Sequence, residues 1–261
     1  MNTSLEIKKI LDQKVKQYNK YDFIANDPIC IPHQFKQQQD IEIAGLFAAL
    51  FSWGNRATII NKSNELLDRM DRSPYEFCMH HGPKDLKKII GFKHRTFNDT
   101  DALYFIEFFK QHFSKHQSLE NAFFKNQVSG QKINSVQAAL VHFQSYFMSL
   151  EDAPRRTQKH VSSPVSGSTC KRLNMYLRWM IRKDHQGVDF GIWNAIKPAA
   201  LIIPIDVHVA RVSRIMGILK RPQTDWQAAL ELTDYCRTLD SKDPVKYDFA
   251  LFSLGVIEKY I

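Results

Sequence analysis

Cysteine is scarce in this chain, and its four cysteines stand far apart, at Cys30, Cys78, Cys170 and Cys236. No pair has the spacing of a metal site or of a C-x-x-C redox motif, so we expect reduced thiols that are mostly buried. A His-Glu-x-x-His zinc motif, a Gly-x-Gly-x-x-Gly motif and a P-loop are all missing from the sequence. His112 and His116 lie one helical turn apart, as in a zinc pair, but no third ligand accompanies them. We therefore predict a protein without a metal ion or other cofactor.

Long hydrophobic runs are missing too. The longest extends from Ile43 to Phe51 if Ala and Gly are included, which is far shorter than the roughly 20 residues that a helix needs to cross a bilayer. Residues 1–16 have a charged, amphipathic pattern and no signal-peptide core. We expect a cytoplasmic monomer that does not bind membranes, and that associates with the nucleoid if its partner is DNA.

Acidic residues are outnumbered, with 27 Asp and Glu against 36 Lys and Arg, which gives a net charge of +9. This balance favours polyanionic partners through long-range attraction and counterion release. The imbalance is greatest between Ala153 and Lys183, where eight Lys or Arg occur without one Asp or Glu. Because residues 154–169 are rich in Ser, Pro, Thr and Gly, we predict a basic loop here. It either presents backbone N–H groups to a phosphate or is a solvated basic face.

Strand-like alternation is rare, whereas apolar residues recur at helical spacing along most of the chain. The sequence therefore predicts an all-α fold. A capping box at Ser73–Glu76, with Pro74 at the first helical position, predicts one helix start, and Gly82-Pro83 predicts a break. An extended segment is expected at 200–203. Helices are expected near residues 5–16, 40–53, 56–70, 74–81, 84–90, 99–113, 135–150, 170–183, 206–216, 225–239 and 244–257.

Two short segments indicate a function. One is Gly-Ser-Thr-Cys-Lys-Arg-Leu-Asn-Met at 167–175, and the other is Ile-Pro-Ile-Asp-Val-His-Val-Ala-Arg-Val at 203–212. Together they resemble the helix-hairpin-helix DNA glycosylase superfamily, which includes endonuclease III and the 8-oxoguanine glycosylases. Lys171 matches the lysine that begins a helix after the hairpin turn, and Asn174 matches an asparagine one turn later. Asp206 lies in a Pro-x-Asp-x-His-Val-x-Arg-Val run that matches the family pattern at each position, and weaker similarity extends over roughly residues 40–255.

The resemblance implies two helical lobes, one over 38–200 with Lys171 and the other over 1–37 and 201–261 with Asp206. It implies excision of a damaged base, such as 8-oxoguanine, from double-stranded DNA, followed by strand nicking (AP-lyase activity). Lys171 would be the nucleophile and Asp206 the electrostatic stabiliser and proton acceptor. Phe190 and Trp193 are candidates for the base pocket. Candidate DNA-binding residues are Gly167, Ser168, Thr169, Arg172, Asn55, Arg56, His208 and Arg211.

This pair suits the chemistry for physical reasons. Breaking an N-glycosidic bond builds positive charge on the sugar, and a nearby carboxylate such as Asp206 stabilises that charge. A lysine amine attacks C1′ and forms a Schiff base only when it is neutral. Burial and the positive end of a helix both disfavour the ammonium form of Lys171, whereas the charge of Asp206 favours it.

The chain departs from the family pattern at several positions. Thr169 replaces the second hairpin glycine and tolerates a positive φ poorly, so the turn must differ or be strained. The connection from Lys171 to Asp206, at 35 positions, is longer than in endonuclease III-like members and is similar to the archaeal 8-oxoguanine glycosylase branch. Gly54 stands where relatives have a glutamine that fills the gap in DNA, which leaves Trp53, Asn55 or Arg56 for that role. The iron–sulfur cysteine cluster is absent.

Simpler interpretations remain open. Asp206 can be only a helix N-cap, Lys171 a surface lysine, His208 and Arg211 a polar helix face, and Phe190 and Trp193 core residues. Among functions, a monofunctional glycosylase would use Asp206 and water, for example on alkylated bases. A non-catalytic DNA- or RNA-binding protein would keep only the scaffold. In a third case the match is ancestral and the protein binds no nucleic acid.

Overall fold

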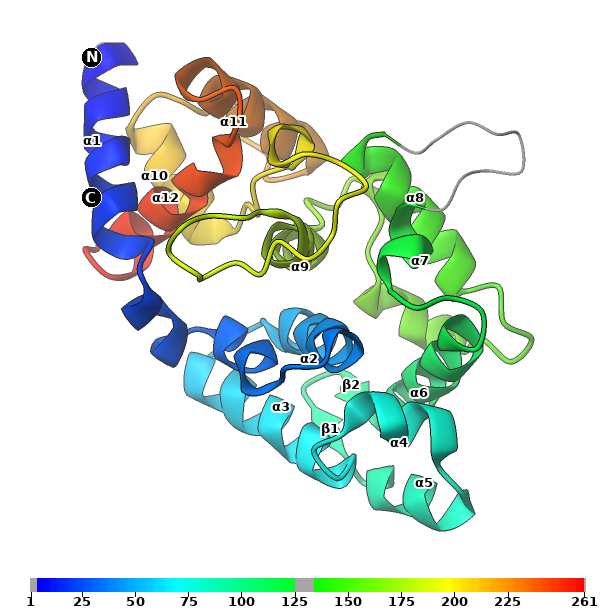
Figure 1. Ribbon diagram of the computed structural model, residues 1–261. Helices are drawn as coiled ribbons and strands as arrows, with labels where there is room; N and C mark the ends of the chain where they lie inside the picture. The colour runs from blue at the N-terminus through cyan, green and yellow to red at the C-terminus, as the bar shows by residue number, and fades with distance from the viewer. Residues whose placement is uncertain (1–3, 125–133, 261) are drawn as a thin grey trace. The chain divides into compact units, whose positions relative to one another are not determined.

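A computed structural model describes residues 4–124 and 134–260, and these residues are mostly helical (Figure 1). The all-α prediction is confirmed. Within the described ranges, the strand pairing consists of a two-residue antiparallel hairpin, β1 (Lys93–His94) with β2 (Phe97–Asn98). No helix in these ranges is long and apolar enough to cross a membrane.

The α-helices follow the predicted order closely. They are α1 (Ser4–Tyr18), α2 (Gln38–Phe51), α3 (Arg56–Arg69), α4 (Pro74–His80), α5 (Pro83–Ile89), α6 (Asp99–Phe113), α7 (Glu120–Phe124), α8 (Val136–Phe147), α9 (Lys171–Ile181), α10 (Val207–Ile215), α11 (Trp226–Leu239) and α12 (Tyr247–Val256). Short 3-10 helices fill several connections: η1 (Tyr21–Asn26), η2 (Pro28–Cys30), η3 (Pro32–Gln34), η4 (Arg155–His160), η5 (Pro164–Ser166), η6 (Pro198–Ala200) and η7 (Pro244–Lys246).

The chain divides into two compact units. The central unit is Asn26–Ser162, and the terminal unit joins Met1–Ala25 to Ser163–Ile261. These boundaries differ from the expected lobes, 38–200 and 1–37 with 201–261. Residues 163–200 belong with the C-terminal helices because, for example, the Trp226 N–H donates to the Gly167 carbonyl oxygen at 3.0 Å. Lys171 and Asp206 therefore lie in the same unit.

The central unit has an aromatic core around α2, which is buried from Asp40 to Phe51. The Phe47 ring lies 5.6 Å from both Phe105 and Phe109 of α6, measured between ring centroids. Phe51 packs edge-on against Phe97 of β2 at 5.0 Å. Such aromatic pairs add specific packing to the burial of a large apolar area, so α2 and α6 are held firmly together.

The terminal unit is built around α12, a helix whose residues are almost all buried. Helices α1 and α10 both pack on it. Gly255 permits the close approach of α10, since a Cβ at this position would lie 3.0 Å from the Cβ of His208. Helix α9 is similarly buried from Leu173 to Ile181, and it brings Lys171 to the start of a rigid element.

Three local predictions need correction or refinement. Helix α4 begins at Pro74 as predicted, but Ser73 makes no side-chain cap bond; instead Asp40 accepts a hydrogen bond from the Tyr75 N–H at 2.9 Å. Leu201 is extended but joins no sheet, and the Ile203 N–H donates to the Thr233 hydroxyl at 3.0 Å. The predicted basic loop contains two 3-10 helices, η4 and η5. In all three segments the backbone N–H groups need hydrogen-bond partners. Asp40 and Thr233 supply two of these partners, and η4 and η5 supply others within the basic segment.

Candidate active site

Lys171 is the first residue of α9, as the motif predicts, and it is half-buried. The turn before it uses positive φ at Gly167 (75°) and at Cys170 (51°), while Thr169 stays outside the left-handed region. The turn therefore places its left-handed residues on either side of Thr169. Cys170 is buried and serves as the N-cap, with its N–H donating to the Ser168 hydroxyl at 3.1 Å.

The hairpin residues differ in what they can offer a phosphate. The Gly167 N–H donates to the Pro164 carbonyl oxygen at 2.9 Å, so it is already used inside the turn. Asn174 holds the turn from within α9, since its side-chain amide donates to the Thr169 carbonyl oxygen at 2.9 Å. Among the described residues, no backbone hydrogen bond is donated by Ser168 or Thr169, so their N–H groups are the better phosphate donors.

Asp206 is the N-cap of α10. One carboxylate oxygen accepts hydrogen bonds from the His208 N–H at 2.9 Å and the Val209 N–H at 3.0 Å. The capping interpretation is therefore correct for this oxygen. It does not exclude a catalytic role, because a carboxylate has a second oxygen and a cap fixes where that oxygen points.

A third charged residue, Asp248 on α12, is influenced by the charges of both Lys171 and Asp206. Burial raises its pKa to about 6, the nearby Arg178 and Lys171 act to lower it, and Asp206 acts to raise it. Lys171 and Asp206 are thus both near enough to Asp248 for their charges to act on it. The charges at the starts of α9 and α10 therefore both act on Asp248 in the first turn of α12. The sequence analysis missed Asp248, although a lone Asp in an otherwise apolar helix was a signal for it.

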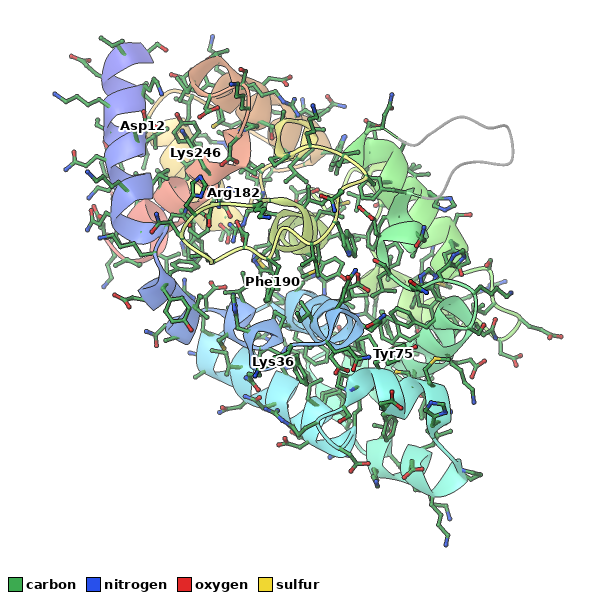
Figure 2. The ribbon with its side chains drawn as sticks, viewed as in Figure 1. Asp12, Lys36, Tyr75, Arg182, Phe190 and Lys246 are labelled. Carbon is green, nitrogen blue, oxygen red and sulfur yellow. The ribbon has the colours of Figure 1, made fainter. Side chains whose placement is uncertain are left out.

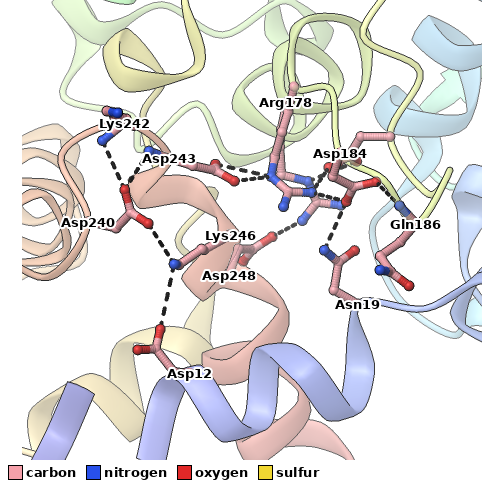
Figure 3. A network of polar contacts seen from close by, with 12 residues as sticks. Asp12, Asn19, Arg178, Asp184, Gln186, Asp240, Lys242, Asp243, Lys246 and Asp248 are labelled. Atoms are coloured by element: carbon pink, nitrogen blue, oxygen red, sulfur yellow. Dashed lines mark hydrogen bonds and ion pairs between the residues drawn. The ribbon is translucent and has the colours of Figure 1, made fainter. Parts of the chain in front are cut away.

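Arg178 and Arg182 belong to a buried ion-pair network that includes Asp248 (Figure 3). Arg178 pairs with Asp248 and with Asp189, the latter at 3.3 Å. The ring of Phe249 lies under both guanidinium groups, 4.3 Å from Arg178 and 5.4 Å from Arg182. Arg182 has further partners on three carboxylates: Asp184 at 2.6 Å, Asp189 at 2.9 Å and Asp243 at 2.9 Å.

The remaining predicted DNA-binding residues of the terminal unit, Arg172, His208 and Arg211, differ in burial and in hydrogen bonding. Burial lowers the pKa of Arg172, the residue after Lys171. His208 is exposed on α10. Arg211 supports α12 instead of facing freely outward, because its guanidinium donates to the carbonyl oxygens of Tyr260 at 2.8 Å and Gly255 at 3.1 Å.

The two aromatic candidates for a base pocket also differ. Trp193 is 1% exposed and its ring packs edge-on against Tyr176 at 5.3 Å. It is a core residue in this structure, so the core interpretation holds and we drop it from the pocket. Phe190, labelled in Figure 2, is half-buried on the segment after α9, and its N–H donates to the Trp179 carbonyl oxygen at 2.8 Å. Phe190 remains the aromatic candidate.

Asn55 and Arg56 belong to the central unit, whereas Lys171 belongs to the terminal unit. Asn55 is an exposed N-cap of α3 that accepts a hydrogen bond from the Thr58 N–H at 3.3 Å. Arg56 is half-buried. Beside them Trp53 is 52% exposed, and the Arg95 guanidinium lies 5.0 Å from its ring centroid. This cation–π pair is the most exposed aromatic feature of the α2–α3 connection.

Metal ligation finds no support in the described ranges, where no group of three or more His, Cys, Asp or Glu is placed to hold an ion. His112, which lies one turn from His116 at a spacing that would suit a zinc pair, illustrates the reason. His112 is buried, and its ring nitrogens contact the Ser118 carbonyl oxygen at 2.9 Å and the Tyr146 hydroxyl at 3.2 Å. Its ring is used for packing and internal hydrogen bonds.

Comparison with known proteins gives one family. A family model described as "Protein of unknown function (DUF2400)" matches residues 27–257. No curated protein and no solved structure matches the chain.

Proposed function

The chain belongs to the DUF2400 family, whose description names no activity, and from its own residues we propose that it is a base-excision DNA glycosylase with AP-lyase activity. The proposed fold is the two-lobed helix-hairpin-helix glycosylase fold, without an iron–sulfur cluster. The observation that carries the proposal is that Lys171 and Asp206, at the starts of two helices of one unit, both act electrostatically on buried Asp248. This juxtaposition gives an amine and a carboxylate on rigid elements, as glycosyl transfer requires.

In the proposed reaction, neutral Lys171 forms a bond from Nζ to C1′ of the nucleotide while the C1′–N bond to the damaged base breaks. The electron pair of the broken bond leaves with the base, which takes up the proton that Nζ releases. The positive charge that develops on the sugar is stabilised by Asp206. Ring opening gives an iminium, and loss of a C2′ proton then expels the 3′ phosphate and nicks the strand.

The proposed substrate is double-stranded DNA that carries an oxidised purine such as 8-oxoguanine. The net charge of +9 favours binding to the phosphate backbone. The Ser168 and Thr169 N–H groups, His208 and the Arg172 side chain are the proposed phosphate contacts next to Lys171. An enzyme that acts on a base in a duplex must extrude that base from the stack. The ring of half-buried Phe190 is the proposed stacking partner of the extruded base. Such a protein would act on the nucleoid.

Borohydride trapping tests the proposal directly. The protein is incubated with duplexes that carry 8-oxoguanine, another lesion or an abasic site, and hydride reduction of the iminium fixes a covalent adduct. We expect an adduct with wild type, none with Lys171→Gln, and a normal adduct with Lys183→Gln, which removes an exposed lysine after the same helix. Base release without any adduct, dependent on Asp206, would instead show a monofunctional glycosylase. Duplex binding without release from any lesion would leave a non-catalytic binding protein.

A further inference from the structure

An aromatic ring is held at the surface of the central unit, in a place that the proposed reaction does not use. Trp53 is 52% exposed in the α2–α3 connection, and the Arg95 guanidinium lies 5.0 Å from its ring centroid. The backbone leaves room for this pair, since Gly54 has a φ of 110° and a Cβ there would lie 2.0 Å from an Arg95 side-chain nitrogen. Arg95 itself has a φ of 54°, a conformation that non-glycine residues rarely adopt. The ring is therefore fixed in a position where a flat ligand can stack on it.

The β1–β2 hairpin, which carries Arg95, is joined to the 3-10 helix η4. Phe97 of β2 is buried and packs edge-on against the His160 ring at 5.0 Å. Arg156 of η4 donates a hydrogen bond to the Thr96 carbonyl oxygen at 3.0 Å. The α2–α3 connection, the hairpin and η4 are thus linked by direct contacts within one unit, although they are far apart in the sequence.

The exposed charges of the hairpin and of η4 are positive. Residues 92–98 and 153–160 have five Lys or Arg and no Asp or Glu, against three carboxylates at the flanking positions 99, 151 and 152. All five cationic residues are exposed: Lys93, Arg95, Arg155, Arg156 and Lys159. Within the described ranges, no ion pair involves the first three of these. Such an excess of exposed positive charge is complementary to a chain of phosphates.

We propose that this surface, formed by Trp53 with residues 93–96 and 155–159, binds single-stranded DNA. The cationic side chains hold the phosphates, and a base stacks on Trp53. A duplex keeps the faces of its bases inside the stack, so an exposed ring beside cations is suited to an unpaired nucleotide. Binding here requires no chemistry at Lys171, which belongs to the terminal unit. Only the choice of DNA over RNA rests on the proposed function, because a glycosylase meets unpaired nucleotides when it extrudes a base.

Fluorescence anisotropy with two labelled oligomers of equal length tests the stacking. One is oligo(dT), and the other is the same sugar–phosphate chain without bases. We expect Trp53→Ala to weaken binding of oligo(dT) about tenfold, as for the loss of one stacked base, and to change binding of the base-free oligomer less than about twofold. Tyr21→Ala, which removes an exposed aromatic side chain of the terminal unit, is the control and should bind both oligomers as wild type does.

The salt dependence of binding tests the cations. The triple variant Lys93→Gln/Arg155→Gln/Lys159→Gln should weaken binding of both oligomers. It should also reduce the slope of log affinity against log salt concentration by about 2, since each neutralised phosphate of a single strand contributes roughly 0.7. The matched control is Lys36→Gln/Lys84→Gln/Lys115→Gln. It removes three exposed lysines of the same unit that lie outside the surface, and should leave the slope within about 0.5 of wild type.

Equal slopes in the two triple variants would overturn the proposal. So would a Trp53→Ala variant that binds oligo(dT) as tightly as wild type, or one that loses affinity equally for both oligomers. Tighter binding of oligo(U) than of oligo(dT) by wild type would assign the surface to RNA and overturn the choice of DNA. None of these oligomers carries a lesion. A missing trapped adduct beside the expected oligo(dT) result would therefore count against the glycosylase proposal alone.

Discussion

Gly255 on α12 and His208 on α10 lie so close that a Cβ added to the glycine would stand 3.0 Å from the His208 Cβ and 3.2 Å from its carbonyl oxygen. The contact is to the first turn of α10, directly after the Asp206 cap. The absence of a side chain at Gly255 therefore determines how closely the first turn of α10 approaches α12.

We predict that Gly255→Ala destabilises the protein, although alanine normally favours a helix over glycine by up to ~1 kcal/mol. Overpacking of the α10–α12 contact should lower the free energy of unfolding by about 1–3 kcal/mol. Chemical denaturation measures it. Gly82→Ala is the control, since its Cβ would meet only the Asp85 carboxylate at 3.8 Å. A stabilised Gly255→Ala variant would contradict the packing described here.

Asp206→Asn should separate the capping role from the proposed catalytic role. Asparagine caps helices about as well as aspartate, so we expect the free energy of unfolding to change by less than ~1 kcal/mol. Loss of the negative charge should slow base excision on the order of a hundredfold or more. Single-turnover excision and thermal unfolding measure the two effects.

Asp225→Asn is the matched control for that experiment. Asp225 caps α11 in the same way, accepting from the Ala228 N–H at 3.0 Å. Its substitution should leave the excision rate within about twofold of wild type. If both substitutions slow excision equally, the role of Asp206 is structural.

Trp53 and Arg95 give a prediction about DNA binding. Trp53 is 52% exposed under the Arg95 guanidinium, in the connection where the family resemblance expects a residue to fill the gap left by an extruded base. We predict that Trp53→Ala weakens binding to an abasic duplex about tenfold, as expected for one stacking contact of roughly 1–3 kcal/mol. The salt dependence of binding should stay unchanged because no charge is lost.

Fluorescence anisotropy at several salt concentrations measures this effect. Tyr21→Ala, which removes another exposed aromatic side chain (71% exposed), is the control and should bind as wild type does. Gly54→Ala should resemble Trp53→Ala. Gly54 has a φ of 110°, and its Cβ would lie 2.0 Å from an Arg95 side-chain nitrogen, so the substitution displaces Arg95 from the ring. Unchanged affinity in Trp53→Ala would remove Trp53 from the interface.

Helices were predictable because their evidence is local. Apolar spacing located α2, α3, α6 and α11 to within a few residues, and Gly82-Pro83 correctly separated α4 from α5. The unit boundary was not predictable in this way. It falls inside a stretch that shows only basic charge in the sequence, and it depends on distant partners such as the contact of Trp226 with Gly167.

In the candidate site too, features that depend on local sequence were predictable and features that depend on distant residues were not. Lys171 and Asp206 could be selected from short motifs, and Thr169 keeps out of the left-handed region, as a threonine should. The use of Cys170 in the left-handed region could not be foreseen, because non-glycine residues rarely adopt it. Asp248 escaped notice for a related reason. Its importance comes from Arg178, 70 positions away in the sequence, and periodicity contains no information about such pairs.

Asp101 should make the stability of the central unit depend on pH. Its side chain is fully buried, with Arg156 at 2.6 Å and His160 at 3.2 Å from one carboxylate oxygen. Burial alone would raise the pKa of Asp101, but the nearby His160 ring and the hydrogen bond from the Thr157 hydroxyl at 2.7 Å outweigh it and lower the pKa to about 2. A depressed pKa means that the stabilisation is complete above the unfolded value near 4 and is lost as the pH falls to about 2. The difference corresponds to about 2 kcal/mol at neutral pH.

Hydrogen exchange of the α6 and η4 peptides tests this linkage. In wild type we expect protection to fall between pH 4 and pH 2, after correction for the intrinsic exchange rate. Asp101→Asn should lose at least this much protection at pH 7 and should show little further loss on acidification, because the titrating group is gone. Asp99→Asn is the control: it alters a half-buried aspartate in the same first turn, and the acid-dependent loss should persist. An acid-dependent loss of the same size in Asp101→Asn would show that another group is responsible, since the stabilisation assigned to Asp101 requires its ionised carboxylate.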